Sequence, residues 1–231
     1  VRGLRADELP AMAKAYGDAV RLAREAGFDA VEIHAGHGYL ISQFLSPSTN
    51  HRKDEFGGSL QNRMRFMDMV MQEVMEAAGS DIAVLVKTNL RDGFKGGMEI
   101  DEALQVAKRL QEYGAHALVL SGGFVSKAPM YVMRGEMPIR SMTHYMKALW
   151  LKYGVRMVGK YMIPTVPFRE AYFLEDALRF RAELQLPLVY VGGLVAREKI
   201  DEVLNDGFEA VQMGRALLNE PGFVNRMRRE E

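Results

Sequence analysis

The sequence contains no cysteine, so it can form no disulfide, no thiolate metal site and no cysteine-ligated iron–sulfur cluster. It also lacks any apolar run that approaches the roughly 18 residues needed to span a bilayer, and its first residues lack the apolar core of a secretion signal. We therefore expect a soluble protein of the cytoplasm with no membrane partner. Redox chemistry would require a bound cofactor.

The chain has no excess charge of either sign, because 30 basic residues balance 30 acidic ones and give a formal net charge of zero. This balance provides no general attraction for nucleic acid, so a phosphate site would have to be local. With 231 residues, 48% of them hydrophobic, the chain is long enough for one large core. We expect residues 1–231 to form a single domain.

Helical and strand patterns alternate along the chain with short connections, which is typical of βα units around a mostly parallel sheet. Five segments are predicted to be strands: residues 30–34, 82–88, 116–121, 187–191 and 209–213. Between about residues 122 and 185 the pattern is less regular, and we interpret this segment as an insertion above a barrel. Within it, helices are predicted near residues 142–152 and 172–184.

Two further helices are predicted in the first third of the chain. One extends from about Asp7, a candidate N-cap, to Gly27, and its apolar face is Leu9, Met12, Ala19, Leu22 and Ala23. The other begins after Ser59, also a candidate N-cap, and carries a continuous apolar stripe formed by Leu60, Met64, Met67, Met71, Val74 and Ala78.

Five βα units are too few for a (β/α)8 barrel, which has eight strands and typically about 250 residues. The sequence also opens without an initiator methionine, inside a polar turn that leads to a helix. We therefore expect an α/β fold that is an incomplete TIM barrel, made of about the last five βα units, with the first three strands absent from this chain.

Two histidines and a tyrosine lie within six positions directly after the first predicted strand. They are His34, His37 and Tyr39, in the string E-I-H-A-G-H-G-Y-L. Ligands of parallel α/β proteins sit at the carboxyl ends of the strands, so this cluster is a candidate reactive site. A single histidine at a strand end is more often structural, but three such residues together favour function. No nearby carboxylate completes a metal site, and we expect none.

Lys87 ends the otherwise apolar second strand, V-L-V-K, so its cation is expected to point into the barrel mouth. It could neutralise an anionic cofactor ring, form a Schiff base with a carbonyl substrate, or pair with a carboxylate such as Asp92. The residues alone leave these alternatives open.

Glycine turns follow the last two predicted strands, at Gly192-Gly193 and at Gly214-Arg215. Glycine allows close approach of the backbone, and a helix start beyond each turn offers unpaired N–H groups. Barrel enzymes often bind phosphate after their last two strands. The two turns and the arginine together predict a phosphate site, and ordinary turn formation is the alternative.

Three parts of the sequence resemble the FMN-dependent Old Yellow Enzyme family. They are A-G-F-D-A-V-E-I-H-A-G-H-G-Y-L-I-S-Q-F-L-S-P at residues 26–47, N-H-R-K-D-E-F-G-G-S-L-Q-N-R at residues 50–63, and V-G-G with M-G-R-A-L-L-N-E-P at residues 191–193 and 213–221. The motifs occur in the family's order and span nearly the whole chain. Members are (β/α)8 barrels that carry FMN at the carboxyl-terminal mouth. The resemblance implies that the five predicted strands are the fourth to eighth of that barrel.

The resemblance also implies roles for single residues. His34 and His37 would hydrogen-bond the carbonyl or nitro oxygen of a substrate, where negative charge develops when hydride adds to the β-carbon. Tyr39, a neutral phenol at pH 7, would donate a proton to the α-carbon. Lys87 would lie near flavin N1 and O2, a position where arginine is commoner in the family. The FMN phosphate would be held by Gly192, Gly193, Gly214 and Arg215.

A polar network outside the site is expected in the second motif, where Asn50, Arg52, Asp54 and Arg63 would anchor a loop. The sequence does not continue into the cysteine-bearing extension of the larger dienoyl-CoA reductase relatives, so an iron–sulfur cluster is not expected.

Three functional hypotheses follow. We favour an FMN-dependent oxidoreductase that takes hydride from NAD(P)H and reduces the C=C bond of a small, enone-like α,β-unsaturated carbonyl compound. The second hypothesis is a truncated barrel without turnover that binds phosphate ligands or a partner chain, because exposed sheet edges would favour a homo-oligomer or pairing with the missing barrel portion. The third is a lyase that forms a Schiff base at Lys87.

Overall fold

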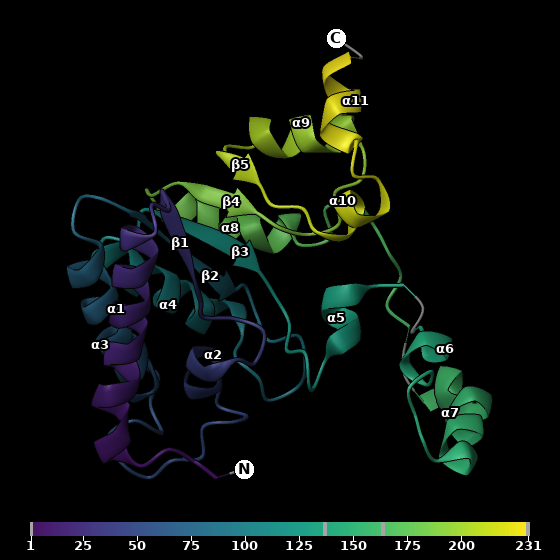
Figure 1. The fold of residues 1–231 in the computed structure, drawn as a ribbon, viewed down its shortest axis with the longest axis horizontal. Coiled ribbons are helices and arrows are strands. Elements are labelled where there is room, and N and C mark those ends of the chain that lie inside the picture. Colours follow the sequence, from purple (N-terminus) through teal and green to yellow (C-terminus); the bar gives the residue numbers. More distant parts are fainter. Residues whose placement is uncertain (1, 136–137, 163–164, 230–231) are drawn as a thin grey trace.

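The computed structural model describes residues 2–135, 138–162 and 165–229. Its centre is a parallel sheet of five strands in the order β1-β2-β3-β4-β5 (Figure 1). The strands are β1 (Ala30–His34), β2 (Ala83–Asn89), β3 (Ala117–Ser121), β4 (Leu188–Tyr190) and β5 (Ala210–Val211). All five strands predicted from the sequence are therefore confirmed, although β4 and β5 are shorter than predicted. The α/β class with a parallel sheet is confirmed as well.

Helices connect the strands, and some of them cover one face of the sheet. They are the 3-10 turn η1 (Ala6–Glu8), α1 (Leu9–Glu25), α2 (Leu40–Leu45), α3 (Leu60–Ala78), α4 (Ile100–Glu112), α5 (Pro129–Met133), α6 (Ile139–Met142), α7 (Leu149–Met162), α8 (Leu174–Glu183), α9 (Arg197–Asn205), α10 (Arg215–Asn219) and α11 (Phe223–Arg229). In Figure 1, α6 and α7 lie apart from the sheet. No helix in the described part of the chain is long and apolar enough to cross a membrane.

The helix after Ser59 forms as predicted. The Ser59 hydroxyl accepts a hydrogen bond from the Asn62 N–H at 3.3 Å, which caps α3, and the whole predicted apolar stripe is buried. The prediction for α1 is wrong in two respects. Asp7 lies inside η1 instead of capping α1. Of the predicted apolar face, Leu9 is buried and Met12 and Ala23 pack on the core, but Ala19 and Leu22 are exposed, because α1 packs on α3 through Leu9, Ala13, Gly17 and Val20.

The irregular segment between β3 and β4 contains α5, α6, α7 and α8. The helix predicted near residues 142–152 is wrong, because α6 ends at Met142 and α7 begins only at Leu149. At the C-cap of α6, the Thr143 N–H and hydroxyl both donate to the carbonyl of Ile139, the first residue of the helix, at 3.0 and 2.7 Å. The predicted helix at 172–184 is confirmed as α8.

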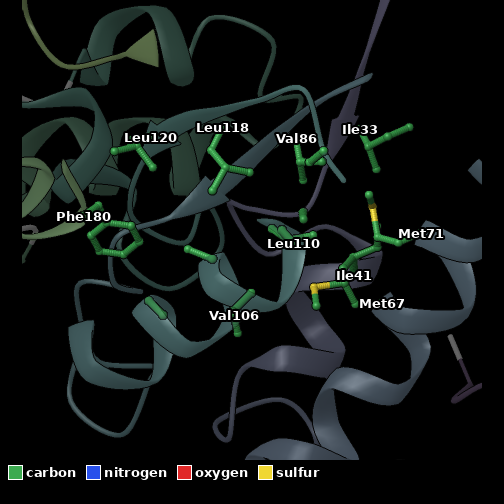
Figure 2. Close-up of a cluster of buried hydrophobic side chains, with 14 of the residues drawn as sticks. Ile33, Ile41, Met67, Met71, Val86, Val106, Leu110, Leu118, Leu120 and Phe180 are labelled. Atoms are coloured by element: carbon green, nitrogen blue, oxygen red, sulfur yellow. The ribbon is translucent and has the colours of Figure 1, made fainter. Parts of the chain in front are cut away.

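The register of the sheet separates its two faces. One face carries Ile33, Val86, Leu118 and Leu120, whose side chains are buried against α3, α4 and α8 together with those of Met71, Val106, Leu110 and Phe180 (Figure 2). This packing is the hydrophobic core. The opposite face, called here the inner face, carries the residues between them in each strand, including Glu32, His34 and Lys87.

Candidate functional site

Polar side chains gather at the carboxyl ends of β1, β2 and β3 on the inner face. His34 pairs in register with Lys87, and Asn89 pairs with Ser121, so these four residues and Glu32 share one side of the sheet. Because strands of a parallel sheet all end at the same edge, the loops that follow them converge there. The predicted residues His34 and Lys87 are thus brought together by strand pairing.

The loop after β1 is held in a left-handed conformation. His37 has φ of 59°, which is uncommon for a residue with a side chain, and its N–H donates to Asn89 Oδ1 at 3.0 Å. Glycine is required on both sides: a Cβ on Gly36 would lie 2.7 Å from Asn89 Oδ1, and one on Gly38 would lie 2.4 Å from the Phe124 ring. The loop geometry therefore depends on residues of the two neighbouring strands and their loops.

The two histidines contact each other directly. His34 Nε2 lies 3.3 Å from His37 Nδ1, and the ring centroids are 5.0 Å apart. On its other side, His37 Nε2 lies 2.8 Å from the Ser121 hydroxyl oxygen. The Gly36 N–H donates to His34 Nδ1 at 3.2 Å. Each ring nitrogen of the pair is thus within hydrogen-bond distance of a defined partner.

Both imidazoles are held in the neutral form. Burial, together with the smaller effects of the nearby His34 and Lys87, lowers the pKa of His37 from 6.5 to about 4. Burial and the charge of Lys87 also lower the pKa of His34. At pH 7 each ring therefore has one N–H donor and one acceptor nitrogen, which suits donation to an oxygen that is becoming negative.

Tyr39 lies at the rim of this cluster. Its ring centroid is 4.8 Å from that of His34, and its side chain is 56% exposed. Backbone geometry places it at the N-cap of α2, where its carbonyl accepts from the Gln43 N–H at 2.8 Å. The phenol is thus close to the histidine pair and open to solvent, an arrangement that allows proton exchange.

Lys87 forms an ion pair with Glu32 and not with Asp92, the candidate partner from the sequence. Its Nζ lies 2.6 Å from Glu32 Oε1, and the second oxygen of Glu32 accepts from Gln212 Nε2 at 2.9 Å. The prediction of Asp92 is wrong, because the Asp92 carboxylate accepts from the Asn89 side chain and the Met98 N–H. Glu32 shares the inner face with Lys87, whereas Asp92 is buried in the following loop.

A cavity of about 330 Å³ joins most of the predicted site. Its wall includes His37 and Lys87 at one end, the buried Ser121, and the predicted phosphate-binding residues Gly192, Gly193, Gly214 and Arg215. His34 and Tyr39 do not line the cavity; His34 contacts His37, and Tyr39 contacts His34. The glycine turns and the histidine loop, far apart in the sequence, therefore open into one space.

The two glycine turns differ in what they offer an anion. A Cβ added to Gly214 would meet no atom within 4 Å, and no described residue accepts a hydrogen bond from its N–H. At the other turn, Gly193 has φ of 68° and packs closely on Tyr172. The N–H groups that lead into α9 already have an acceptor, because the Glu170 carboxylate accepts from the N–H groups of Val195 and Ala196 at 2.8 and 2.9 Å.

Arg215 is oriented by the chain itself. Its guanidinium donates to the carbonyl oxygens of Met133 and, at 3.2 Å, Val132. These bonds leave part of its donor capacity unused, because a guanidinium has five N–H groups in a fixed plane. Arg215 therefore lines the cavity with its direction already set by the end of α5.

The polar network predicted around residues 50–63 is confirmed. The Asn50 amide donates to the carbonyls of Phe44 and Phe56 at 2.7 Å each, and Arg52 pairs with Asp54. The buried Arg63 donates to the carbonyl of Leu45 and to Glu102. These bonds fix the loop between α2 and α3 and place no group in the cavity.

Three residues of the site were missed by sequence analysis: Glu32, Asn89 and Ser121. Each is a polar residue in or at the end of an apolar strand. Glu32 lies two positions from His34, Asn89 lies two positions from Lys87, and Ser121 pairs in register with Asn89. That alternation was the available signal for Glu32, which is two residues from His34. For Asn89 and Ser121 the roles depend on contacts with the loop after β1 and could not be seen locally.

Comparison with known proteins gives one consistent result. A model of the NADH:flavin oxidoreductase / NADH oxidase family matches residues 1–231. The chain is 39% identical, over all of its 231 residues and 57% of the relative, to a 4,4'-dithiodibutanoate disulfide reductase from Rhodococcus erythropolis. It is 39% identical over 154 residues to a cinnamate reductase from Clostridium sporogenes, which covers 58% of this chain and 23% of that protein.

The fold is also found in solved structures. An Old Yellow Enzyme homologue from Zymomonas mobilis superposes with a TM-score of 0.70 and 25% identity, covering 100% of this chain and 54% of that one. The chain thus spans about half the length of the disulfide reductase and of the Zymomonas homologue, and about a quarter of the cinnamate reductase.

Proposed function

The chain belongs to the NADH:flavin oxidoreductase / NADH oxidase family, and from this premise we propose that it binds FMN and reduces activated C=C bonds with hydride from NAD(P)H. The resemblance to Old Yellow Enzymes, noted from the motifs, is confirmed by the comparisons. The observation that carries the proposal is the single cavity that joins His37 and Lys87 to both glycine turns.

The residues of the cavity fit FMN. The open space at Gly214 and its unused N–H, beside Arg215, suit a phosphate group. At the other end, the Lys87 cation suits a ring system that gains negative charge on reduction. Gly192, Gly193 and Gly214 provide backbone that a ligand can approach closely. When bound, FMN would supply hydride transfer.

The chain's own residues would then act on the substrate. His34 and His37, neutral and adjacent, would donate hydrogen bonds to the carbonyl oxygen, where negative charge develops. Tyr39, beside His34 and open to water, would deliver a proton to the α-carbon and be reprotonated from solvent. The substrate class is a small α,β-unsaturated carbonyl compound. A relative named cinnamate reductase is consistent with this class.

We also propose that this chain is an incomplete TIM barrel and a single domain whose segment 122–185 is an insertion. Two observations support the first part. The chain spans about half the length of the disulfide reductase and NADPH dehydrogenase relatives, and the exposed side chains of Ala19 and Phe28, the latter 64% exposed, line a surface hollow beside β1, the edge strand of the sheet. A preceding barrel strand would pair with that edge and cover those side chains.

The Lys87 Schiff-base hypothesis is less well supported. The 2.6 Å contact with Glu32 stabilises the charged ammonium group, which has no lone pair for attack on a carbonyl. The same contact leaves a cation at the cavity wall, as the flavin hypothesis requires. Borohydride trapping with a carbonyl substrate separates the two, because only the lyase would become covalently labelled at Lys87.

The test is to separate the two half-reactions by anaerobic stopped-flow spectroscopy of the FMN-loaded chain. Replacing Tyr39 by Phe should slow reoxidation by 2-cyclohexenone by about 100-fold, the usual size of general-acid catalysis, and leave flavin reduction by NAD(P)H near normal. Tyr145→Phe is the matched control, because Tyr145 is 88% exposed in the turn before α7.

Equal slowing of both half-reactions would contradict the role of Tyr39. A chain that binds FMN but is reduced by neither nicotinamide would support the second hypothesis, a barrel fragment that binds phosphate ligands without turnover.

A further inference from the structure

Ser121 is a buried serine for which the proposed mechanism has no role. It ends β3, it is 2% exposed, and its Oγ lies 2.8 Å from His37 Nε2. It also lines the cavity. A hydroxyl can both donate and accept hydrogen bonds, so Ser121 is compatible with His37 Nε2 as either a donor or an acceptor.

The surrounding contacts decide which ring nitrogens carry hydrogen. Because the Gly36 N–H donates to His34 Nδ1, a neutral His34 carries its hydrogen on Nε2. That N–H is directed at His37 Nδ1, 3.3 Å away, which must then be an acceptor. A neutral His37 therefore carries its hydrogen on Nε2 and donates it to Ser121 Oγ. Both imidazole hydrogens are used within the protein in this arrangement.

Binding of a substrate oxygen by both rings requires a different arrangement. His37 must then carry its hydrogen on Nδ1, so that it and His34 Nε2–H can both donate to one oxygen between them. His37 Nε2 then becomes an acceptor. If the buried group beside it could not donate, this nitrogen would be left without a hydrogen-bond partner, and an unpaired buried acceptor costs free energy. Ser121 is the group within hydrogen-bond distance of that nitrogen.

We propose that Ser121 is a positioning residue that allows His37 to change tautomer. Its hydroxyl turns from acceptor to donor, the ring loses the proton on Nε2 and gains one on Nδ1 by exchange with water, and the net charge stays the same. The histidine pair then has two N–H donors for one substrate oxygen. This inference rests on the proposed function, because it names how the same site receives its substrate.

Two substitutions and a control separate this role from a structural one. Ser121→Ala removes the hydroxyl, and Ser121→Thr keeps it. Ser46→Ala is the matched control, because Ser46 is also fully buried but its hydroxyl oxygen has no hydrogen-bond partner among the described residues. Loss of packing alone would change the enone affinity of both alanine variants. Loss of the hydroxyl that turns from acceptor to donor would change only that of Ser121→Ala.

The first measurement is the imidazole ¹⁵N spectrum of the flavin-free chain, in which the shifts of Nδ1 and Nε2 report the tautomer. We expect hydrogen on Nε2 of both His34 and His37. Hydrogen on Nδ1 of His37 in this sample would overturn the inference, because no change of tautomer would then be needed. This result does not depend on whether the chain is a reductase.

The second measurement uses the chain loaded with oxidised FMN and saturated with 2-cyclohexenone. In the wild type and in Ser121→Thr, the His37 hydrogen should move to Nδ1. Ser121→Ala should bind the enone about tenfold more weakly, the effect of one lost hydrogen bond, and Ser46→Ala should bind it normally. Retention of Nε2–H in the saturated wild type, or normal affinity in Ser121→Ala, would overturn the inference. Failure of FMN to load would count against the proposed function instead.

Discussion

The Asn89 side chain accepts a hydrogen bond from the backbone N–H of His37 at 3.0 Å, and this contact joins the end of β2 to the loop after β1. The same amide donates to Asp92 at 3.0 Å and to the Gly123 carbonyl at 2.9 Å. One buried side chain thus holds the loops that follow three successive strands. The left-handed backbone of His37 is kept in place by this contact and by the packing of Phe124 on Gly38.

Replacing Asn89 by Ala should therefore destabilise the protein. The substitution leaves a backbone N–H, a carbonyl and a carboxylate without their buried partner, and we expect a loss of about 2–3 kcal/mol in the free energy of unfolding. Urea denaturation measures it. Asn205→Ala, at the exposed end of α9, is the control and should change stability by less than about 0.5 kcal/mol. Equal effects of the two substitutions would show that Asn89 does not hold the loops.

A side chain at position 38 should be excluded for two reasons: the positive φ of the backbone, and the close approach of the Phe124 ring. Gly38 and Gly58 have φ of 84° and 85°, but only a Cβ on Gly38 would meet a neighbour within 4 Å. Gly58→Ala should cost about 1–2 kcal/mol from backbone strain, and Gly38→Ala about 1–3 kcal/mol more from overpacking. Thermal unfolding compares them directly. Similar costs would mean that the Phe124 contact relaxes freely.

Stability should fall as the pH is lowered from about 6.5 to about 4. Unfolded histidine binds a proton near its ordinary pKa of 6.5, whereas burial lowers the pKa of His37 in the folded protein to about 4. Between these values the unfolded state binds more protons, so His37 contributes a slope of at most about 1.4 kcal/mol per pH unit. His37→Asn should reduce the slope, since asparagine tolerates the left-handed backbone, and the exposed His51→Asn should not. An unchanged slope in His37→Asn would contradict the assignment.

The ion pair between Lys87 and Glu32 should tune the flavin. Neutralising Glu32 leaves the Lys87 cation unbalanced, so Glu32→Gln should stabilise the anionic reduced ring and raise the two-electron midpoint potential by on the order of 20–40 mV, equivalent to about 1–2 kcal/mol. Lys87→Met should lower it. Glu112→Gln, which breaks an exposed pair with Arg109, is the control. A lowered potential in Glu32→Gln would place the lysine away from the ring.

Much of the fold could be predicted from sequence because it depends on local patterns. The stripe from Leu60 to Ala78 and the five apolar strands each lie within one element, and the alternation of apolar and polar residues sets their buried faces. Ala19 and Leu22 were wrongly assigned to the apolar face of α1, because that face was identified from the residues of α1 alone. The exposed Ala19 and Phe28 lie beside β1 at the edge of the sheet, where the packing partner depends on neighbouring elements.

The site was predictable where it consists of motifs and not where it consists of contacts between loops. His34, His37, Lys87 and the glycine turns were recognised by their position after strands. Glu32, Asn89 and Ser121 were not, because their roles arise from contacts between strands and loops that bring residues 52 to 84 positions apart within hydrogen-bond distance. No local spacing encodes such a contact.

The most direct test of the account is a titration of the purified chain with FMN, followed by flavin fluorescence and absorption, in the wild type and in Gly214→Val. Because a Cβ on Gly214 meets no protein atom within 4 Å, valine should leave the fold intact while filling the proposed phosphate cradle. Gly222→Val, with equally open surroundings outside the cavity, is the control. We predict saturable binding of one FMN per chain, weakened at least tenfold by Gly214→Val alone. Absence of saturable binding, or equal binding by the Gly214→Val variant, would contradict it.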